Sequence, residues 1–338
     1  MDALRSESLA GIMVQLRLST GTHALTSPMS FDESVVASEV TFVGDAGSVL
    51  SLPAAAAVGR QLAETTDGTS STRAAFSLNS TLKLHLEGLN ITGDAASHGV
   101  AAVLVHRGLL VMRQCVVRGV QGTRALHAIG IGATVEVGGS LSVTTPTPTL
   151  SPLTPTPTPS PKQVGGSHFE GNLGGAVVAA AGSHVLIAHS ALERNEAEEG
   201  GAISVSGGNT TVHLVGTRVA LNVATTRGGG LHVTGGVVAL SNRTVLEDNS
   251  APEGHTMQLL GGATSYYLPA PAGRWVNTAV LDTERGTLVS AVALGAHVED
   301  YPFPCREGHV GSDDDISTQL NPDCVGPCPA GKICTANP

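Results

Sequence analysis

The stretch that decides the fold is "ALERNEAEEGGAIS", residues 191–204, in which one asparagine precedes a glycine pair and a short apolar run. Similar stretches occur before it, "HFEGNLGGAVV" at 168–178, and after it, "RVALNVATTRGGGLHV" at 218–233. The asparagines of this pattern are separated by 23, 27 and 27 residues: Asn172, Asn195, Asn222 and Asn249. The glycine pairs begin 26 and 28 residues apart: Gly174 and Gly175, Gly200 and Gly201, Gly228 and Gly229. A regular period of this length is typical of a solenoid, whose coils stack on one another.

Between the glycine pairs lie short runs of alternating apolar and polar residues, such as "AISVSGGNTTVHLVGT" at 202–217. Each period holds about three such strand-like runs, separated by Gly, Ser or Asn. We therefore expect an all-β chain that forms a right-handed parallel β-helix with about three short strands per coil and about ten coils of ~27 residues. The glycine pairs would allow positive φ at a sharp corner, and stacked asparagine amides would hydrogen-bond from coil to coil. Similar strands also build sandwiches and propellers, but the asparagine period favours a solenoid.

The chain divides further by composition. A less regular version of the rhythm extends through the first half, for example in "SEVTFVGDAGSVLSL" at 38–52. It stops at "TTPTPTLSPLTPTPTPSP", 144–161, which holds 7 of the 18 prolines and is expected to be extended and solvated because proline cannot donate to a strand ladder. "VGGSLS" precedes this segment and "VGGSHF" follows it, which favours an insert in one coil over an interdomain linker. The expected organisation is N-terminal coils at 1–143, the Pro/Thr-rich insert or linker at 144–162, coils with Asn and Gly-Gly repeats at 163–262, a closing segment at 263–300 and a cysteine-rich module at 301–338.

Composition argues against two kinds of partner. The net charge is −10 and no basic cluster is present, so nucleic-acid binding is not expected. The longest apolar runs fall short of the ~18 residues of a spanning helix, so we expect no membrane span in this chain. The N-terminus, "MDALRSESLAGIMVQLRLST", carries charges that a signal peptide lacks. We therefore expect an incomplete N-terminus and a chain that is part of a longer polypeptide.

The repeats "FEGNLGGAV", "LERNEAEEGGAI" and "ALNVATTRGGGL" resemble those of the polymorphic outer-membrane-protein family, which is defined by F-x-x-N followed by G-G-A-[ILV]. The likeness covers residues 165–262. Phe169 keeps the aromatic position, and aliphatic residues replace it in the other repeats: Leu192, Val219 and Leu246. After Asn249 the glycine pair is replaced by "PEGHT". The resemblance implies a pectin-lyase-like right-handed β-helix and, by analogy, a surface-displayed adhesin.

Four of the five cysteines lie near the C-terminus: Cys305, Cys324, Cys328 and Cys334. Cysteines this dense in a loop-rich tail predict disulfides and an oxidising compartment, and four cysteines allow three pairings. The gaps of 18, 3 and 5 residues do not form the two C-x₂-C knuckles typical of a zinc site. "CVGPCPAGKIC" resembles the ephrin-receptor-like cysteine-rich module, C-x-x-C-P-x-G-x-x-C, with one extra residue in the first gap and a chain that stops shortly afterwards.

Four N-x-[ST] sequons are present, with acceptors at Asn79, Asn90, Asn209 and Asn242. Together with the cysteine-rich tail and the Pro/Thr segment, they indicate a secreted or cell-surface glycoprotein. Asn209, which follows "SGG", has the best context for a turn, whereas Asn90 lies inside an expected strand.

The expected function is non-catalytic: a long surface for adhesion or for binding an extracellular glycan or protein. We expect no cofactor, no metal and no catalytic residues. The alternative is a lyase or hydrolase of the pectin-lyase-like superfamily that acts on an acidic polysaccharide. Such an enzyme needs clustered carboxylates, and the one dense group, "EAEEGG", is interpreted as a solvated turn.

Overall fold

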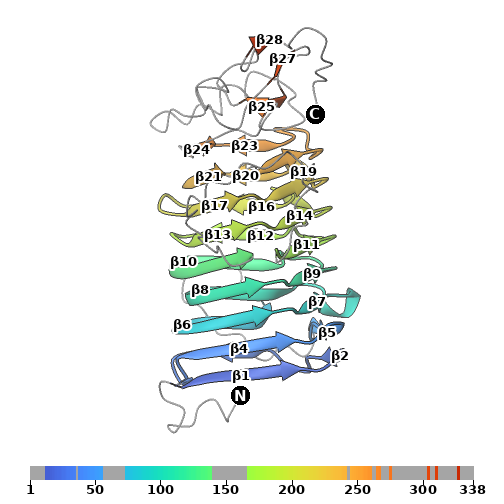
Figure 1. The fold of residues 1–338 in the computed structure, drawn as a ribbon, viewed down its shortest axis with the longest axis vertical. Helices are drawn as coiled ribbons and strands as arrows, with labels where there is room; N and C mark the ends of the chain where they lie inside the picture. Colours follow the sequence, from blue (N-terminus) through green and yellow to red (C-terminus); the bar gives the residue numbers. More distant parts are fainter. Residues whose placement is uncertain are drawn as a thin grey trace, which may run out of the picture.

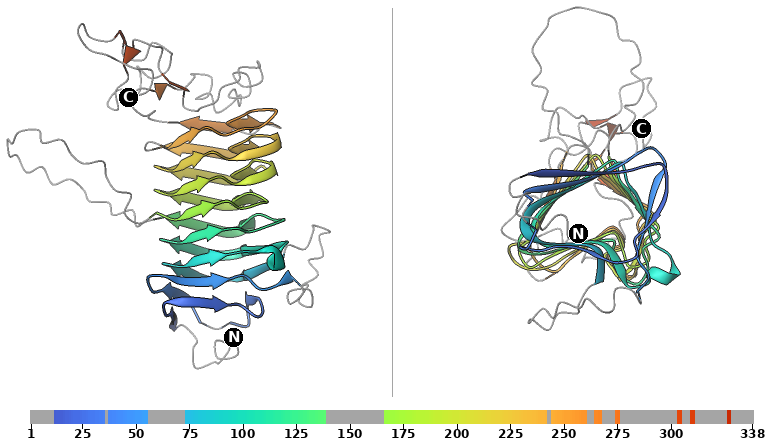
Figure 2. Two further views of the ribbon diagram at one scale, coloured as in Figure 1. Left: turned by 90° about the vertical axis from the view of Figure 1, so that its right-hand side faces the viewer. Right: turned by 90° about the horizontal axis from the view of Figure 1, so that it is seen from below.

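The computed structural model describes residues 12–35, 37–55, 73–138, 166–241 and 244–260, and short strands at 264–267, 274–275, 303–304, 309–310 and 326–327. The strands stack along one axis as a parallel β-helix (Figure 1). Seen along that axis, the coils superpose around a common interior (Figure 2). The predicted fold class is confirmed: the chain is all-β, and every ladder between stacked coils is parallel.

The clearest count of the coils comes from an eight-stranded sheet in which each coil contributes one strand. Its order is β2 (Gly21–Ala24), β5 (Ser48–Ser51), β7 (Asn90–Thr92), β9 (Val116–Arg118), β11 (His168–Glu170), β14 (Ala191–Glu193), β18 (Arg218–Ala220) and β22 (Val245–Glu247). Successive strands of this sheet are one turn apart, so the eight strands enclose seven full turns, fewer than the expected ten. The reason is that two steps are much longer than 27 residues, because each includes a segment outside the described residues: 56–72 and 139–165.

A second, 14-stranded sheet covers two sides of each coil. Its main path is β1 (Met13–Leu18), β4 (Glu39–Gly44), β6 (Arg73–Glu87), β8 (Val100–Arg113), β10 (Leu126–Gly138), β12 (Val177–Ala180), β16 (Ile203–Val205), β20 (Leu231–Val233) and β23 (Met257–Leu259). A side branch holds β13 (His184–Ala188), β17 (Thr211–Val215), β21 (Val237–Ser241) and β24 (Thr264–Tyr267), and β3 (Met29–Phe31) pairs with β6.

The number of strands per coil varies along the axis around the expected three, which is the number in the coil of β11, β12 and β13. In the first half β6, β8 and β10 each run round a corner as one long strand, with register shifts at the bend. In the second half a turn divides the equivalent stretch in two, for example into β12 and β13. Two of these later coils also contain a further short strand, β15 (Glu196–Glu199) and β19 (Val223–Arg227), which pair with each other.

The core is a set of stacked aliphatic columns. The F-x-x-N position forms one of them, because Phe169, Leu192, Val219 and Leu246 are in register and fully buried. At the N-terminal end three phenylalanines pack edge to face, with ring centroids 6.3 Å and 5.4 Å apart: Phe31, Phe42 and Phe76. The short repeat thus builds a thin core from Val, Leu, Ile and Ala with few aromatics, as the composition requires.

The coils before and after residues 139–165 are direct neighbours. β9 pairs with β11, and β10 pairs with both β12 and β13. The strands on the two sides of the Pro/Thr-rich segment therefore belong to the same sheets.

Near the C-terminus the described strands form two antiparallel pairs, β25 (Arg274–Trp275) with β26 (Phe303–Pro304) and β27 (His309–Val310) with β28 (Gly326–Pro327). One short 3₁₀ helix, Ala95–Ser97, is capped by the side chain of Asp94. Among the described residues no helix is long and apolar enough to cross a membrane.

Candidate functional site

The four repeat asparagines form one buried column. Nδ2 of Asn172 donates to Oδ1 of Asn195 at 2.8 Å, Asn195 donates to Asn222 at 2.9 Å, and Asn222 donates to Asn249 at 2.9 Å. Each Oδ1 also accepts a hydrogen bond from a backbone N–H of the preceding coil. For Asn172, the first residue of the column, this donor is the N–H of Val120. Each Nδ2 of the four asparagines also donates to a backbone carbonyl, which is in turn that of Val117, Phe169, Leu192 and Val219. These amides are therefore part of the framework rather than a binding site.

The glycine pairs have two different steric roles. Gly200 and Gly228 have φ of 61°, the left-handed region that favours glycine. Gly201 and Gly229 have no positive φ, but a Cβ on either would lie 2.2–2.3 Å from a carbonyl oxygen of the next coil. In the following coil, where the sequence has "PEGHT", Gly254 takes the same place as Gly228 with the same φ of 61°.

The first glycine pair makes room for a half-buried cation. Nη1 of Arg124 donates to the Gly200 carbonyl at 2.6 Å, and Nη2 donates to the Glu199 carbonyl. A Cβ on Gly175 would lie 2.3 Å from Nη1. Burial lowers the pKa of Arg124 to about 10, and burial together with the charge of Arg124 lowers the pKa of His127 to about 4. This cluster joins three coils and leaves His127 neutral at pH 7.

The dense acidic group is a strand, not the turn that was expected. Residues Glu196–Glu199 form β15, with Glu196 and Glu198 exposed. Oε2 of Glu199 lies 3.2 Å from Nδ1 of His232, whose imidazole is only 2% exposed. The buried imidazole is thus held by a carboxylate and is closed to a substrate.

Three acids that are far apart in sequence lie on one outer face, where the coils bring them together. Glu170, Glu193 and Glu247 project from β11, β14 and β22. Arg194 pairs with Glu170 at 3.0 Å, and Arg218 joins Glu193 to Glu247, with Nε 2.7 Å from the latter. Burial lowers the pKa of Arg218, but hydrogen bonds and charges from Glu247 and Glu193 outweigh it, and the pKa is raised. Every carboxylate of this row therefore has a guanidinium partner.

The signal for this row was present in the sequence. "FEGN", "LERN" and "LEDN" each place a glutamate two residues before a ladder asparagine. The same period that predicts the asparagine column therefore places these glutamates in a column too.

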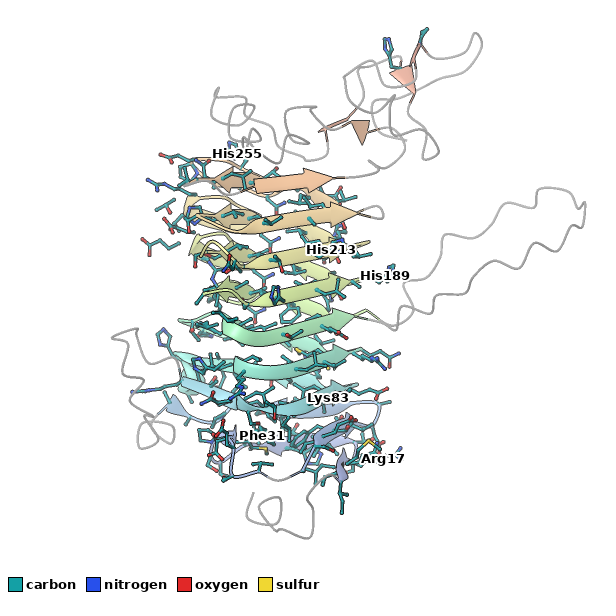
Figure 3. All side chains as sticks on the ribbon, turned by 90° about the vertical axis from the view of Figure 1, so that its left-hand side faces the viewer. Arg17, Phe31, Lys83, His189, His213 and His255 are labelled. Atoms are coloured by element: carbon teal, nitrogen blue, oxygen red, sulfur yellow. The ribbon has the colours of Figure 1, made fainter. Side chains whose placement is uncertain are left out.

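One outer surface runs along the side of the solenoid over eight stacked strands, and we call it the long face. It consists of two columns of side chains on the outer side of β1, β4, β6, β8, β10, β13, β17 and β21: Met13, Glu39, Lys83, Leu109, Thr134, His184, Thr211 and Val237, beside Gln15, Thr41, His85, Val111, Glu136, Leu186, His213 and Ala239. Figure 3 labels Lys83 and His213. Val111 and Ala239 are largely covered, with 5% and 6% exposed. With strands ~4.8 Å apart, eight strands span about 34 Å.

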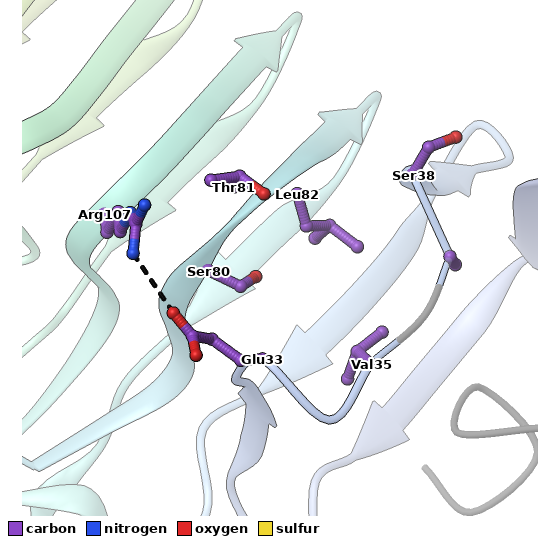
Figure 4. A pocket seen from close by; sticks show the side chains of 8 residues that line it. Glu33, Val35, Ser38, Ser80, Thr81, Leu82 and Arg107 are labelled. Atoms are coloured by element: carbon purple, nitrogen blue, oxygen red, sulfur yellow. Dashed lines mark hydrogen bonds and ion pairs between the residues drawn. The ribbon is translucent and has the colours of Figure 1, made fainter. Parts of the chain in front are cut away.

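A cavity of about 450 Å³ opens beside the N-terminal end of the long face (Figure 4). It exists because two strand segments of unequal length face each other. Phe31 pairs with Leu78 and Glu39 pairs with Lys83, so seven residues, 32–38, stand opposite four, 79–82. The two segments therefore cannot stay in one register, and the hollow is lined by described residues of both.

The hollow is lined by both polar and apolar side chains. Nη1 of Arg107 lies 3.1 Å from Oε1 of Glu33, and the two side chains are 53% and 78% exposed. Apolar walls come from Val35 and Leu82, and further lining residues are Ala37, Ser38, Ser80 and Thr81. Figure 4 shows Ser80, Thr81 and Leu82 between the ion pair on one side and Ser38 on the other.

Ser80 is the unusual member of the lining. It occupies an inward position of β6, between the buried Leu78 and Leu82, yet its hydroxyl has no hydrogen-bond partner in the described structure. The residue is 4% exposed. Leaving a buried hydroxyl unpaired costs about 1–3 kcal/mol, so the position is one where a bound polar group would be stabilising.

The remaining predicted sites are placed as follows. Asn79 and Asn209 are exposed, and Asn90 is half-buried with Oδ1 enclosed and unpaired. Asn242 and the four C-terminal cysteines, Cys305, Cys324, Cys328 and Cys334, lie outside the described residues. Cys115 is buried, and burial raises the pKa of its thiol to about 12. In the described part of the chain no three metal-ligating side chains gather into a cluster.

Comparison with family models, with curated proteins and with solved structures finds no match to this chain.

Proposed function

We propose that this is an extracellular or cell-surface protein that uses the long face, without catalysis, to bind a glycan or a protein. The observation that carries the proposal is the composition of that face. Its two columns contain only two carboxylates among sixteen side chains, Glu39 and Glu136. Thr, Val, Leu and His make up most of the rest, which is a mixed surface suited to docking.

The spacing of those carboxylates argues against glycoside hydrolysis on this face. Glycosidases place two carboxyl groups about 5–9.5 Å apart. Glu39 is on β4 and Glu136 on β10, three strand spacings away, or about 14 Å. The column neighbours of Glu136 are Val111 and Leu186, which offer no acid, base or cation.

The alternative, a polysaccharide lyase or hydrolase, rests on two exposed carboxylates elsewhere. Glu196 and Glu198 project from the same side of β15. Two residues along a strand span about 6.8 Å, which is within the range for an acid and base pair. The carboxylates of the other acidic row are bound to arginines and are not free for proton transfer.

The proposed extracellular location and glycosylation are based on sequence features. The sequons, the cysteine-rich C-terminus and the Pro/Thr-rich segment support an extracellular setting. The likeness of the repeats to the polymorphic outer-membrane-protein family and of the tail to the ephrin-receptor-like module supports adhesion by analogy.

The test is a combined binding and product assay with protein from a secretory host. The protein is incubated with immobilised acidic and neutral polysaccharides and with intact cells, and retention and new oligosaccharide ends are both measured. Thr211→Arg places a bulky cation on the long face, and Thr225→Arg makes the same change at an exposed position of β19. We expect retention without new ends, lost in T211R and kept in T225R. New ends that disappear in Glu196→Gln or Glu198→Gln would favour the enzyme.

A further inference from the structure

The hollow between residues 32–38 and 79–82 has the features of a ligand site that the long face does not share. It is concave, it is lined by side chains of described residues, and one of these, Ser80, is buried with an unpaired hydroxyl. Its volume of about 450 Å³ lies within the usual range for small-ligand pockets. We propose that this hollow binds one neutral sugar or similar polyol unit. The proposal rests on the proposed function, because it would make the hollow an end site for a glycan docked on the long face.

We infer that the ligand is neutral from the charged side chains at the opening of the hollow. Glu33 and Arg107 neutralise each other at 3.1 Å, so neither an anion nor a cation meets an unbalanced charge there. A divalent cation would find one carboxylate and no second acidic ligand among the lining residues.

The hydrogen-bond donors and acceptors of the lining residues favour a ligand with several hydroxyl groups. The Arg107 guanidinium can donate, the Glu33 carboxylate can accept, and the hydroxyls of Ser38, Ser80 and Thr81 can do both. A sugar hydroxyl that reached Ser80 would provide the partner that this group lacks. The aliphatic side chains of Val35 and Leu82 offer an apolar wall for the C–H face of a ring.

The sugar has two sources that share this chemistry. It is either the end of an external glycan or the first residue of a glycan carried by this chain, because Asn79, Ser80 and Thr81 form a sequon at the edge of the hollow. Asn79 is exposed and pairs in register with Arg107. Comparison of glycosylated wild type with Asn79→Gln separates the two sources.

The experiment uses the full chain, with Asn79→Gln as the reference that lacks a glycan at position 79. Ligand-observed NMR and calorimetry are run with glucose, galactose, mannose, N-acetylglucosamine and myo-inositol, and with glucuronate and glucosamine as charged controls. Ser80→Ala removes the unpaired hydroxyl, and Ser204→Ala removes a half-buried hydroxyl from β16 as the matched control. Because Ser80→Ala deletes an unsatisfied buried group, its Tm should be equal to or above that of the reference.

We expect at least one neutral sugar to bind, with affinity about fivefold to tenfold weaker in Ser80→Ala and unchanged in Ser204→Ala, the size expected for one hydrogen bond. Neutral-sugar binding by Asn79→Gln but not by glycosylated wild type would identify the chain's own glycan as the occupant. No binding of any neutral sugar at millimolar concentration, or equal binding by Ser80→Ala, would overturn the proposal. Retention of Ser80→Ala on the polysaccharide or cell surface is measured separately. If this variant is retained like wild type while no neutral sugar binds, the proposal for the hollow is wrong but the proposed function of the long face is not affected.

Discussion

Asn195 donates its side-chain amide to Oδ1 of Asn222, 27 residues later, at 2.9 Å, and both side chains are fully buried. The contact is one step of a column in which every amide also satisfies backbone groups of the adjacent coil. We therefore expect Asn195→Ala and Asn222→Ala each to lower the free energy of unfolding by about 3 kcal/mol, since each leaves several buried groups unpaired. Thermal denaturation followed by circular dichroism measures this. Asn209→Ala, at an exposed turn, is the control, and equal melting temperatures for all three variants would contradict the ladder.

The second glycine of each pair should tolerate no side chain. A Cβ on Gly229 would lie 2.2 Å from the carbonyl oxygen of His255, and this neighbour is backbone that cannot rotate away. We expect Gly229→Ala to destabilise by more than about 3 kcal/mol or to prevent folding. Gly208→Ala is the matched control, because nothing lies within 4 Å of its Cβ position. A normal melting temperature for Gly229→Ala would show that the coils are not stacked as described.

Stability should fall on mild acidification because of His127. Burial lowers its pKa to about 4 in the folded protein, against about 6.5 when unfolded. Since the folded value is the lower one, the unfolded chain binds more protons between these pH values. Relative to its value above about pH 6.5, the free energy of unfolding therefore falls as the pH is lowered toward 4, and the loss due to His127 is about 2 kcal/mol at pH 5.

His127→Gln should therefore flatten the fall of Tm between pH 7 and pH 5. His184→Gln, which changes an exposed imidazole, should leave the slope as in wild type. Parallel slopes for wild type and His127→Gln would mean that His127 is not held neutral by burial.

The sequons should differ in occupancy when the protein is made in a secretory host. Asn79 and Asn209 are exposed, whereas Asn90 is half-buried and its Oδ1 is enclosed. We expect glycan on the first two and none on Asn90. Peptide mass spectrometry after enzymatic deglycosylation in heavy-oxygen water reports each site, and an occupied Asn90 would contradict its placement in β7.

Much of the fold could be predicted because the repeat is a local signal. Asn195 and Asn222 mark the coil length, and Gly200 and Gly228 mark the corner where φ must be positive. The number of turns could not be predicted from chain length. The flanking "VGGSLS" and "VGGSHF" favour an insert at the Pro/Thr-rich segment, but no local signal shows that 56–72 lies between strands of adjacent coils. Gly254 was missed because it stands alone, although its spacing from Gly228 is 26 residues.

The candidate site was much less predictable. The hollow depends on which residues of two distant strands pair, Phe31 with Leu78 and Glu39 with Lys83, and no motif encodes that register. That the Ser80 hydroxyl has no hydrogen-bond partner depends on the residues packed around it, which the sequence alone does not identify. The glutamate row, in contrast, follows the asparagine period and could have been found.

The central claim is that the long face binds a ligand without chemical change, and one comparison tests it most directly. Wild type, T211R and T225R are applied to the polysaccharide or cell surface that retains wild type, and bound protein and new oligosaccharide ends are measured together. The account predicts that wild type and T225R are retained, that T211R is at least tenfold weaker, and that no new ends appear. Equal retention of T211R, or product formation by purified wild type, would contradict it.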